Sequence, residues 1–102
     1  MEANQYQYEA MKTRLPTADL EYCVMNLAAE AGEVAGLFAK ARRDVKLIDK
    51  DNLCKELGDC VWQVAAVAHL SGLTLEEILE ANLIKLASRQ KRGTLTGKGD
   101  NR

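Results

Sequence analysis

Four carboxylates are spaced so that they could act together on a metal ion. They form two pairs, each with its members three residues apart: Glu30 with Glu33, and Glu56 with Asp59. Residues three apart lie on one face of a helix, so each pair would form a small acidic patch. Mg²⁺ and Mn²⁺ prefer oxygen ligands, and Mg²⁺ is usually held by one or two carboxylates together with substrate phosphates. The spacing predicts either a divalent metal site suited to a nucleotide or two ordinary solvated helix faces.

Two long helices are expected to carry these pairs. Apolar residues spaced by three and four follow Asp19, a suitable N-cap, and predict a helix over about residues 19–43. A second helix over about 51–70 should end near Gly72, because glycine readily adopts the left-handed conformation of a helix C-cap. The link between the two helices is short, so they should be antiparallel neighbours. On each helix the acidic pair lies along one flank of the apolar stripe, so packing would bring the pairs together.

Two shorter helices are expected over about 4–13 and 74–89. The first should end before Leu15-Pro16, because the residue ahead of proline is pushed out of helical geometry. The second begins with the capping box Thr74-Leu75-Glu76-Glu77. No strand signal or repeat is present, so the predicted fold class is all-α and resembles a four-helix bundle. The 102 residues should form a single domain, with about 92–102 as a flexible or lid-like tail.

Charge and composition exclude several classes of partner. Fourteen Lys and Arg against fifteen Asp and Glu give a net charge of -1, which provides no general attraction to nucleic acid or to an anionic membrane. No apolar run approaches the roughly 18 residues of a membrane span, and the N-terminal segment is polar where a signal peptide would be apolar. The cysteines form no C-x-x-C pair and lie among apolar neighbours, which favours buried, reduced thiols and a cytoplasmic location: Cys23, Cys54 and Cys60.

The segment 61–70 is too apolar for the surface of a monomer. Its apolar side chains cover nearly the whole circumference of a helix, and such a helix is normally buried on all sides. A homodimer that packs this segment against its symmetry mate would bury it, as would a monomer whose other helices wrap around it. Trp62, the only tryptophan, points away from the apolar stripe centred on Leu57 and is expected in a dimer core rather than as a base-stacking platform.

A family resemblance follows from the two acidic segments taken together. Leu27-Ala28-Ala29-Glu30-Ala31-Gly32-Glu33-Val34 and Lys55-Glu56-Leu57-Gly58-Asp59 resemble the E-E-x-x-E and E-x-x-D motifs of the MazG-like branch of all-α nucleoside triphosphate pyrophosphohydrolases, which are related to the dimeric dUTPases. The resemblance continues at Asn82–Leu86, Arg89, Arg92–Thr94 and Gly99–Arg102. One position departs from the motif, since Ala29 stands where the family has its first glutamate.

The resemblance implies a Mg²⁺-dependent enzyme, with Mn²⁺ as a substitute, that converts a (d)NTP to the (d)NMP and pyrophosphate in nucleotide-pool control or house-cleaning. It implies a dimer or dimer of dimers, and it makes the four motif carboxylates both metal ligands and catalytic residues: Glu30, Glu33, Glu56 and Asp59. The chain offers no persuasive covalent nucleophile, so a metal-activated water should attack phosphorus. Ala29 keeps open the alternative of a non-catalytic nucleotide-binding or helical dimerisation module.

Six further residues are candidates for binding the substrate: Lys40, Arg43, Asn82, Lys85, Arg89 and Arg92. Lys40 and Arg43 either bind the triphosphate or complement the dipole at a helix C-terminus. Asn82 and Lys85 match the family's N-x-x-K-L segment, which resembles a substrate-contacting one. The alternatives are that Asn82 bridges to another helix, and that Lys85 and Arg89 extend into water. Arg92 lies at the start of the irregular tail. This tail would either fold over phosphates or be disordered.

Overall fold

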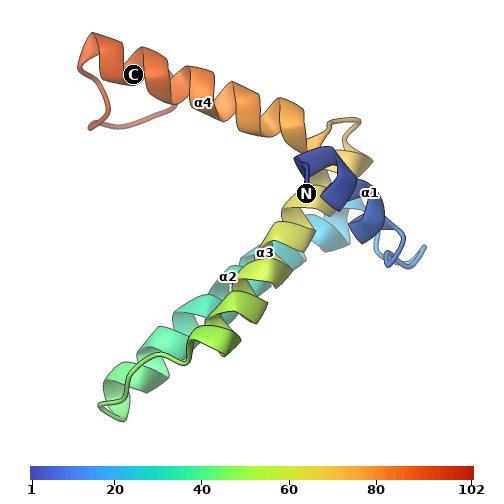
Figure 1. Ribbon diagram of the computed structural model, residues 1–102, viewed down its shortest axis with the longest axis vertical. Coiled ribbons are helices and arrows are strands. Elements are labelled where there is room, and N and C mark those ends of the chain that lie inside the picture. Colours follow the sequence, from blue (N-terminus) through green and yellow to red (C-terminus); the bar gives the residue numbers. More distant parts are fainter.

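The computed structural model describes residues 1–102 and contains four α-helices and no strand (Figure 1). They are α1 (Ala3–Met11), α2 (Leu20–Arg43), α3 (Lys50–Leu70) and α4 (Leu75–Arg92). The all-α prediction is confirmed, and each helix lies within a few residues of its expected range. In Figure 1, α2 and α3 run side by side as a long hairpin, α1 lies against the end of α3, and α4 leaves that end in another direction.

Side-chain caps set where the helices begin. Asp19 caps α2, and Thr74 and Glu77 form the expected capping box of α4, in which Thr74 Oγ1 accepts from the Glu77 N–H at 3.1 Å. The helix α3 begins at Lys50, one residue earlier than predicted. The reason is that Asp49 caps it, accepting a hydrogen bond from the N–H of Asp51 at 2.9 Å. Local cap chemistry therefore fixes the start of the helices that carry the acidic pairs.

The C-terminal half of α3 is covered within its own chain. Ala65, Ala66 and Ala68 are buried, and α1 and the start of α4 pack against this half of the helix. Val61, nearer the middle of α3, remains 47% exposed. The other helices of the chain thus bury the alanines of segment 61–70 but leave part of that segment exposed.

A buried glutamine ties α1, α3 and α4 together. Gln7 is 7% exposed, and its Nε2 donates to the carbonyl oxygens of Ala65 at 3.2 Å and of Leu73 at 3.1 Å. Its Oε1 accepts a hydrogen bond from the N–H of Leu75 at 3.0 Å. Two of these bonds satisfy backbone groups at the turn between α3 and α4, and the third joins Gln7 to a carbonyl within α3. Gln7 therefore fixes the point from which α4 departs.

Replacing Gln7 by alanine should lower the free energy of unfolding by about 1–3 kcal/mol, because buried backbone groups at the turn would lose their partner. Urea denaturation followed by circular dichroism measures this loss. Gln5→Ala is the matched control, since Gln5 lies on the same helix and is exposed. Equal effects of the two substitutions would show that the buried hydrogen bonds do not hold the turn.

One chain leaves much apolar surface uncovered. The helix α4 makes no contact with α2, and the radius of gyration is 16.3 Å, whereas about 13 Å is typical of a compact domain of this length. The accessible surface is 7813 Å², against about 5,700 Å² for a compact monomer of this mass. On α4, Leu83 and Ile84 are 66% and 71% exposed. These apolar residues are available to pack against another surface.

All three cysteines are free thiols, as predicted, but only Cys23 is buried. The prediction of three buried thiols is wrong for Cys54, which is exposed, and for Cys60, which is half-buried. Both lie in the half of α3 nearer the link, where α2 is the neighbouring helix and the opposite side of α3 is open (Figure 1). None of the helices has the length and apolar character needed to cross a lipid bilayer.

Candidate metal centre

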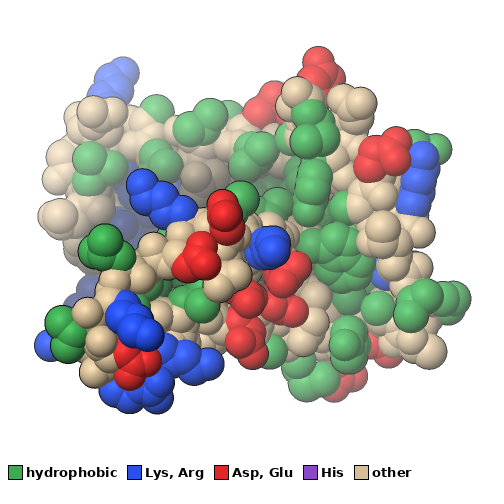
Figure 2. All heavy atoms as spheres, turned by 60° about the horizontal axis from the view of Figure 1, so that its bottom comes forward, with side chains coloured by type: hydrophobic (Ala, Val, Ile, Leu, Met, Phe, Trp, Pro, Cys, Tyr) green, Lys and Arg blue, Asp and Glu red, His purple; other side chains and the backbone are tan.

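The α2–α3 hairpin brings three of the four predicted carboxylates into one cluster. Glu30 on α2 and Glu56 and Asp59 on α3 each offer an oxygen, and these oxygens all lie within 4.8 Å of one another. Glu30 and Glu56 are half-buried and Asp59 is exposed. Figure 2 shows acidic side chains gathered in the middle of the face that it presents. The ion pairs of the chain involve other carboxylates, so no lysine or arginine forms an ion pair with the cluster.

Glu33 lies one helical turn beyond Glu30 and is not part of this tight cluster. Its side chain is exposed, whereas Glu30 faces α3. Of the four carboxylates predicted to form one site, three therefore form the tight cluster and Glu33 lies at its edge. Glu33 is still close enough for its charge to act on Glu30.

The pKa of Glu30 reflects burial and the repulsion between neighbouring carboxylates. Burial raises the pKa of Glu30, and the negative charges of Asp59, Glu56 and Glu33 raise it further, in that order. A divalent cation among the carboxylates would remove this repulsion. Oxygen donors at short mutual distance that form no ion pair with a lysine or arginine fit Mg²⁺ or Mn²⁺.

The raised pKa of Glu30 predicts how stability depends on pH without metal. Because the folded-state pKa lies above the unfolded value, the folded protein binds the proton more tightly. In EDTA, stability should therefore fall as the pH rises from the unfolded pKa of Glu30 through its folded pKa. Glu30→Gln should remove this contribution to the slope and raise the melting temperature at pH values above the folded-state pKa of Glu30.

Thermal denaturation at several pH values, with and without Mg²⁺, tests this prediction. Mg²⁺ should raise the melting temperature of the wild type more than that of Glu30→Gln. Glu80→Gln is the control, because Glu80 is an exposed glutamate on α4. A metal-free Glu30→Gln protein that melts below the wild type at neutral pH would contradict the repulsion.

The helix α1 places a tyrosine beside the centre. Burial and the charge of Asp59 raise the pKa of Tyr6, which is half-buried. No spacing pattern in the sequence links Tyr6 to the acidic pairs, because α1 reaches this position only through its packing on α3.

Comparison with known proteins agrees with this arrangement. The family model of the MazG nucleotide pyrophosphohydrolase domain matches residues 19–94, which include α2, α3, α4 and every clustered carboxylate. The chain belongs to this MazG family. The Gene 37 protein of Mycobacterium phage L5 is 41% identical to it over 87 residues, which cover 81% of this chain and 76% of that protein. No solved structure is significantly similar to the chain.

In this MazG domain, the candidate substrate residues of α4 lie away from the metal centre of the same chain. Lys85 Nζ contacts Asp100 Oδ1 at 2.9 Å, and Arg89 Nη2 donates to the Asp100 carbonyl oxygen at 2.7 Å. Arg92 Nη2 donates to the Arg102 carbonyl oxygen at 2.8 Å, so the tail folds back along α4. Asn82 is exposed. One chain does not bring these side chains to the carboxylate cluster.

Of the two predictions for Arg89, extension into water is wrong, because the side chain is 4% exposed and held by the tail. Substrate binding by Arg89 stays a prediction. The hydrogen bonds from Lys85 and Arg89 lower the pKa of Asp100, so this carboxylate stays ionised. Arg89 therefore fixes the tail of the MazG domain on α4.

The basic end of α2 lies at the link between the two hairpin helices. Lys40 and Arg43 are in the last turn of α2, and Arg43 forms two hydrogen bonds with Asp44, at 2.8 and 3.0 Å. Lys40 lies about two turns along α2 from Glu33. Of the two residues, Lys40 keeps its charge unpaired and available to an anion.

Proposed function

We propose that this MazG domain is a divalent-metal-dependent nucleoside triphosphate pyrophosphohydrolase. It converts a (d)NTP to the (d)NMP and pyrophosphate, in nucleotide-pool control or house-cleaning in the cytoplasm. The observation that carries the proposal is the cluster of Glu30, Glu56 and Asp59, which forms no ion pair with a lysine or arginine, in a chain of a nucleotide pyrophosphohydrolase family.

The three clustered carboxylates would hold Mg²⁺, or Mn²⁺ in its place. When bound, the cation supplies positive charge that offsets the phosphate oxygens and favours deprotonation of the attacking water. Lys40, at the end of α2, is placed to bind the far phosphates of the substrate, with Arg43 beside it.

Glu33 is the best placed proton acceptor. Its carboxylate lies one turn from Glu30 but outside the cluster, so it is not committed to holding the metal. It would orient the water and take its proton as the new oxygen–phosphorus bond forms. The anhydride bond between the α and β phosphorus atoms breaks, and pyrophosphate leaves.

The functional unit is a homodimer or a dimer of dimers. Apolar side chains exposed on α2 and α4 would be buried between copies, including Met25 and Phe38 on α2. The helix α4 of one chain would then complete the site of another with its candidate substrate residues: Asn82, Lys85, Arg89 and Arg92. This requires that the tail is displaced from α4, because Lys85 and Arg89 bind Asp100 and Arg92 binds the Arg102 carbonyl.

The direct test is product identity. Purified protein with Mg²⁺ should release pyrophosphate, and not orthophosphate, from at least one of a panel of common and modified (d)NTPs, and EDTA should stop the reaction. The products can be separated by ion-exchange chromatography. A folded protein that releases no pyrophosphate with Mg²⁺ or Mn²⁺ from any nucleotide would refute the enzyme proposal.

A second candidate is a nucleotide-binding module without turnover, and Ala29 is the observation that favours it. The position lacks the glutamate that opens the family's motif, so one acidic group near the centre is missing. Calorimetry separates the two candidates, because tight nucleotide binding in Mg²⁺ without product formation would identify the binding module.

A further inference from the structure

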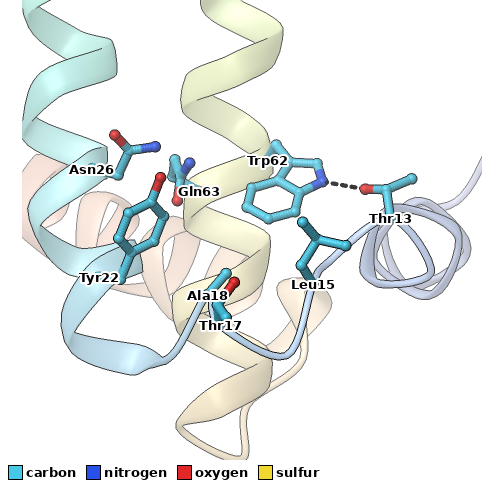
Figure 3. Close-up of a pocket in the computed structure, with 8 residues that line it drawn as sticks. All are labelled: Thr13, Leu15, Thr17, Ala18, Tyr22, Asn26, Trp62 and Gln63. Atoms are coloured by element: carbon cyan, nitrogen blue, oxygen red, sulfur yellow. Dashed lines mark hydrogen bonds between the residues drawn. The ribbon is translucent and has the colours of Figure 1, made fainter.

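Cations that could bind phosphates gather on α4 and not at the cavity of the α2–α3 hairpin. That cavity, of about 360 Å³, is formed by α2, α3 and the segment that joins α1 to α2, and no charged side chain lines it (Figure 3). At about 100° per residue, Lys85, Arg89 and Arg92 share one face of α4, within an arc of about 60°. This face of α4 therefore carries three positive charges along about two helical turns.

The tail that follows α4 lies over this face. Lys85 Nζ donates to Asp100 Oδ1 at 2.9 Å, and Arg89 Nη2 donates to the same oxygen at 3.2 Å. Arg92 Nη2 donates to the Arg102 carbonyl oxygen at 2.8 Å. The helix α4 contacts only α1 and α3 among the helices, and the tail is the segment that runs along its far end (Figure 1). The tail is therefore what buries Arg89.

Asp100 uses only part of the hydrogen-bonding capacity of this site. The bonds from Lys85 and Arg89 lower the pKa of Asp100, so its carboxyl group is an anion. Both bonds go to one oxygen, Oδ1, while Arg89 Nε is buried without an acceptor. A guanidinium can donate from two nitrogens to two oxygens of one anion, and a phosphate group offers three oxygens. Once the tail moves away, a phosphate would satisfy Arg89 more fully and still contact Lys85.

We propose that Asp100 is an internal competitor of the substrate, which occupies the place of a phosphate on Lys85 and Arg89 until a nucleotide displaces the tail. The inference rests on the proposed function, in which these residues of α4 bind substrate. Both ion pairs are weak, because the Asp100 side chain is 81% exposed to solvent. Such a contact lowers the apparent affinity for phosphates without preventing binding, since the fraction of chains with a free site sets the apparent dissociation constant.

The affinity for a phosphate analogue tests the proposal by the sign of its change. Methylenediphosphonate resembles pyrophosphate but has a P–C–P bridge that resists hydrolysis, and calorimetry in Mg²⁺ measures its binding to the full chain. Asp100→Ala should bind it about three- to tenfold more tightly than the wild type, because two exposed ion pairs no longer compete. Asp100→Glu, which keeps the charge, should restore the wild-type affinity. Circular dichroism checks that the variants fold.

Glu80→Ala is the matched control. It changes the net charge by the same amount as Asp100→Ala, but Glu80 is exposed on the opposite face of α4. Its affinity for methylenediphosphonate should equal that of the wild type.

Release of the tail provides a second measurement. Trypsin should cleave after Lys98 faster when the tail is detached, because a protease needs an extended and unattached segment. A saturating concentration of methylenediphosphonate should therefore speed this cleavage in the wild type, as mass spectrometry can follow. The free peptide of residues 90–102 controls for any effect of the anion on trypsin itself.

The outcomes separate this proposal from the proposed function. Tighter binding by Asp100→Ala with faster cleavage supports competition even if no nucleotide is hydrolysed, which would refute only the enzyme proposal. Equal binding, or no binding by any variant, would overturn the competition. Weaker binding by Asp100→Ala would also overturn it, and would mean that Asp100 holds Lys85 and Arg89 ready for phosphate. Cleavage that the anion leaves unchanged would contradict displacement of the tail. Hydrolysis of a nucleotide alongside any of these contrary results would leave the enzyme proposal intact.

Discussion

Neutralising Glu56 or Asp59 is expected to abolish metal-dependent release of pyrophosphate. Each contributes an oxygen to the set that lies within 4.8 Å, and no other side chain of the chain replaces it there. Substituting groups that only support metal ligands commonly costs 10- to 100-fold in affinity or activity, so loss of a ligand should cost more than about 100-fold. Glu56→Gln and Asp59→Asn keep the size of the side chain, so the hairpin should fold normally.

The measurement is initial pyrophosphate release at saturating Mg²⁺, with Glu80→Gln as a control that should retain full activity. Glu33→Gln distinguishes the two roles assigned to the carboxylates. It should lose turnover yet keep most of the stabilisation by Mg²⁺, because Glu33 lies outside the cluster. Glu56→Gln should lose both. If Glu56→Gln retained more than a tenth of wild-type activity with an unchanged metal requirement, the metal centre would have to lie elsewhere.

The acidic pairs and the helices that carry them were predictable because they depend on local chemistry. Asp19 and Thr74 cap their helices as expected, and a spacing of three residues places two carboxylates on one helix face. Packing of α2 against α3 then brings the pairs together without further assumptions, since the link is short. That Glu33 is exposed while Glu30 faces α3 depends on how the two helices are rotated, which spacing within each helix does not specify.

The position of α4 could not be predicted in the same way. Its periodic apolar residues show which face tends to be buried, but they do not identify the surface that covers it. In one chain Leu83 and Ile84 remain exposed, while Arg89 is buried under the tail. The contact of Arg89 with Asp100 joins residues 11 apart through a non-helical segment, so no helical spacing reveals it.

Gln63 is a buried polar residue whose importance the sequence analysis missed. It lies inside the apolar segment 61–70 and follows Asp59 by four residues, and both facts are visible in the sequence. A polar amide in an otherwise apolar helix face requires a partner, so the position of Gln63 was informative. In the structure Asn82 is exposed and Gln63 is the buried amide without a partner.

Two inactive variants are expected to restore activity when they are mixed. Metal ligands lie on α2 and α3, whereas Lys85 lies on α4, which makes no contact with α2 in the same chain. If α4 completes the site of a partner, a dimer of one Glu56→Gln chain and one Lys85→Met chain contains one site without either substitution. That site combines α2 and α3 of the Lys85→Met chain with α4 of the Glu56→Gln chain. Random pairing of equal amounts would make about half of the dimers heterodimers, each with one intact site of its two. The mixture should therefore recover about a quarter of the wild-type activity.

The mixture is prepared by unfolding both variants together in urea and refolding them, and light scattering confirms the dimer. The control is a mixture of Glu56→Gln with Asp59→Asn. Both substitutions damage the α3 part of the site, so every site in that heterodimer carries one of them and no activity should return. Recovery in the first mixture but not in the second requires α4 to act in trans. If the first mixture shows only the mean of the two separate activities, Lys85 acts within its own chain or not at all, and α4 must then move toward the hairpin for its residues to reach the metal centre.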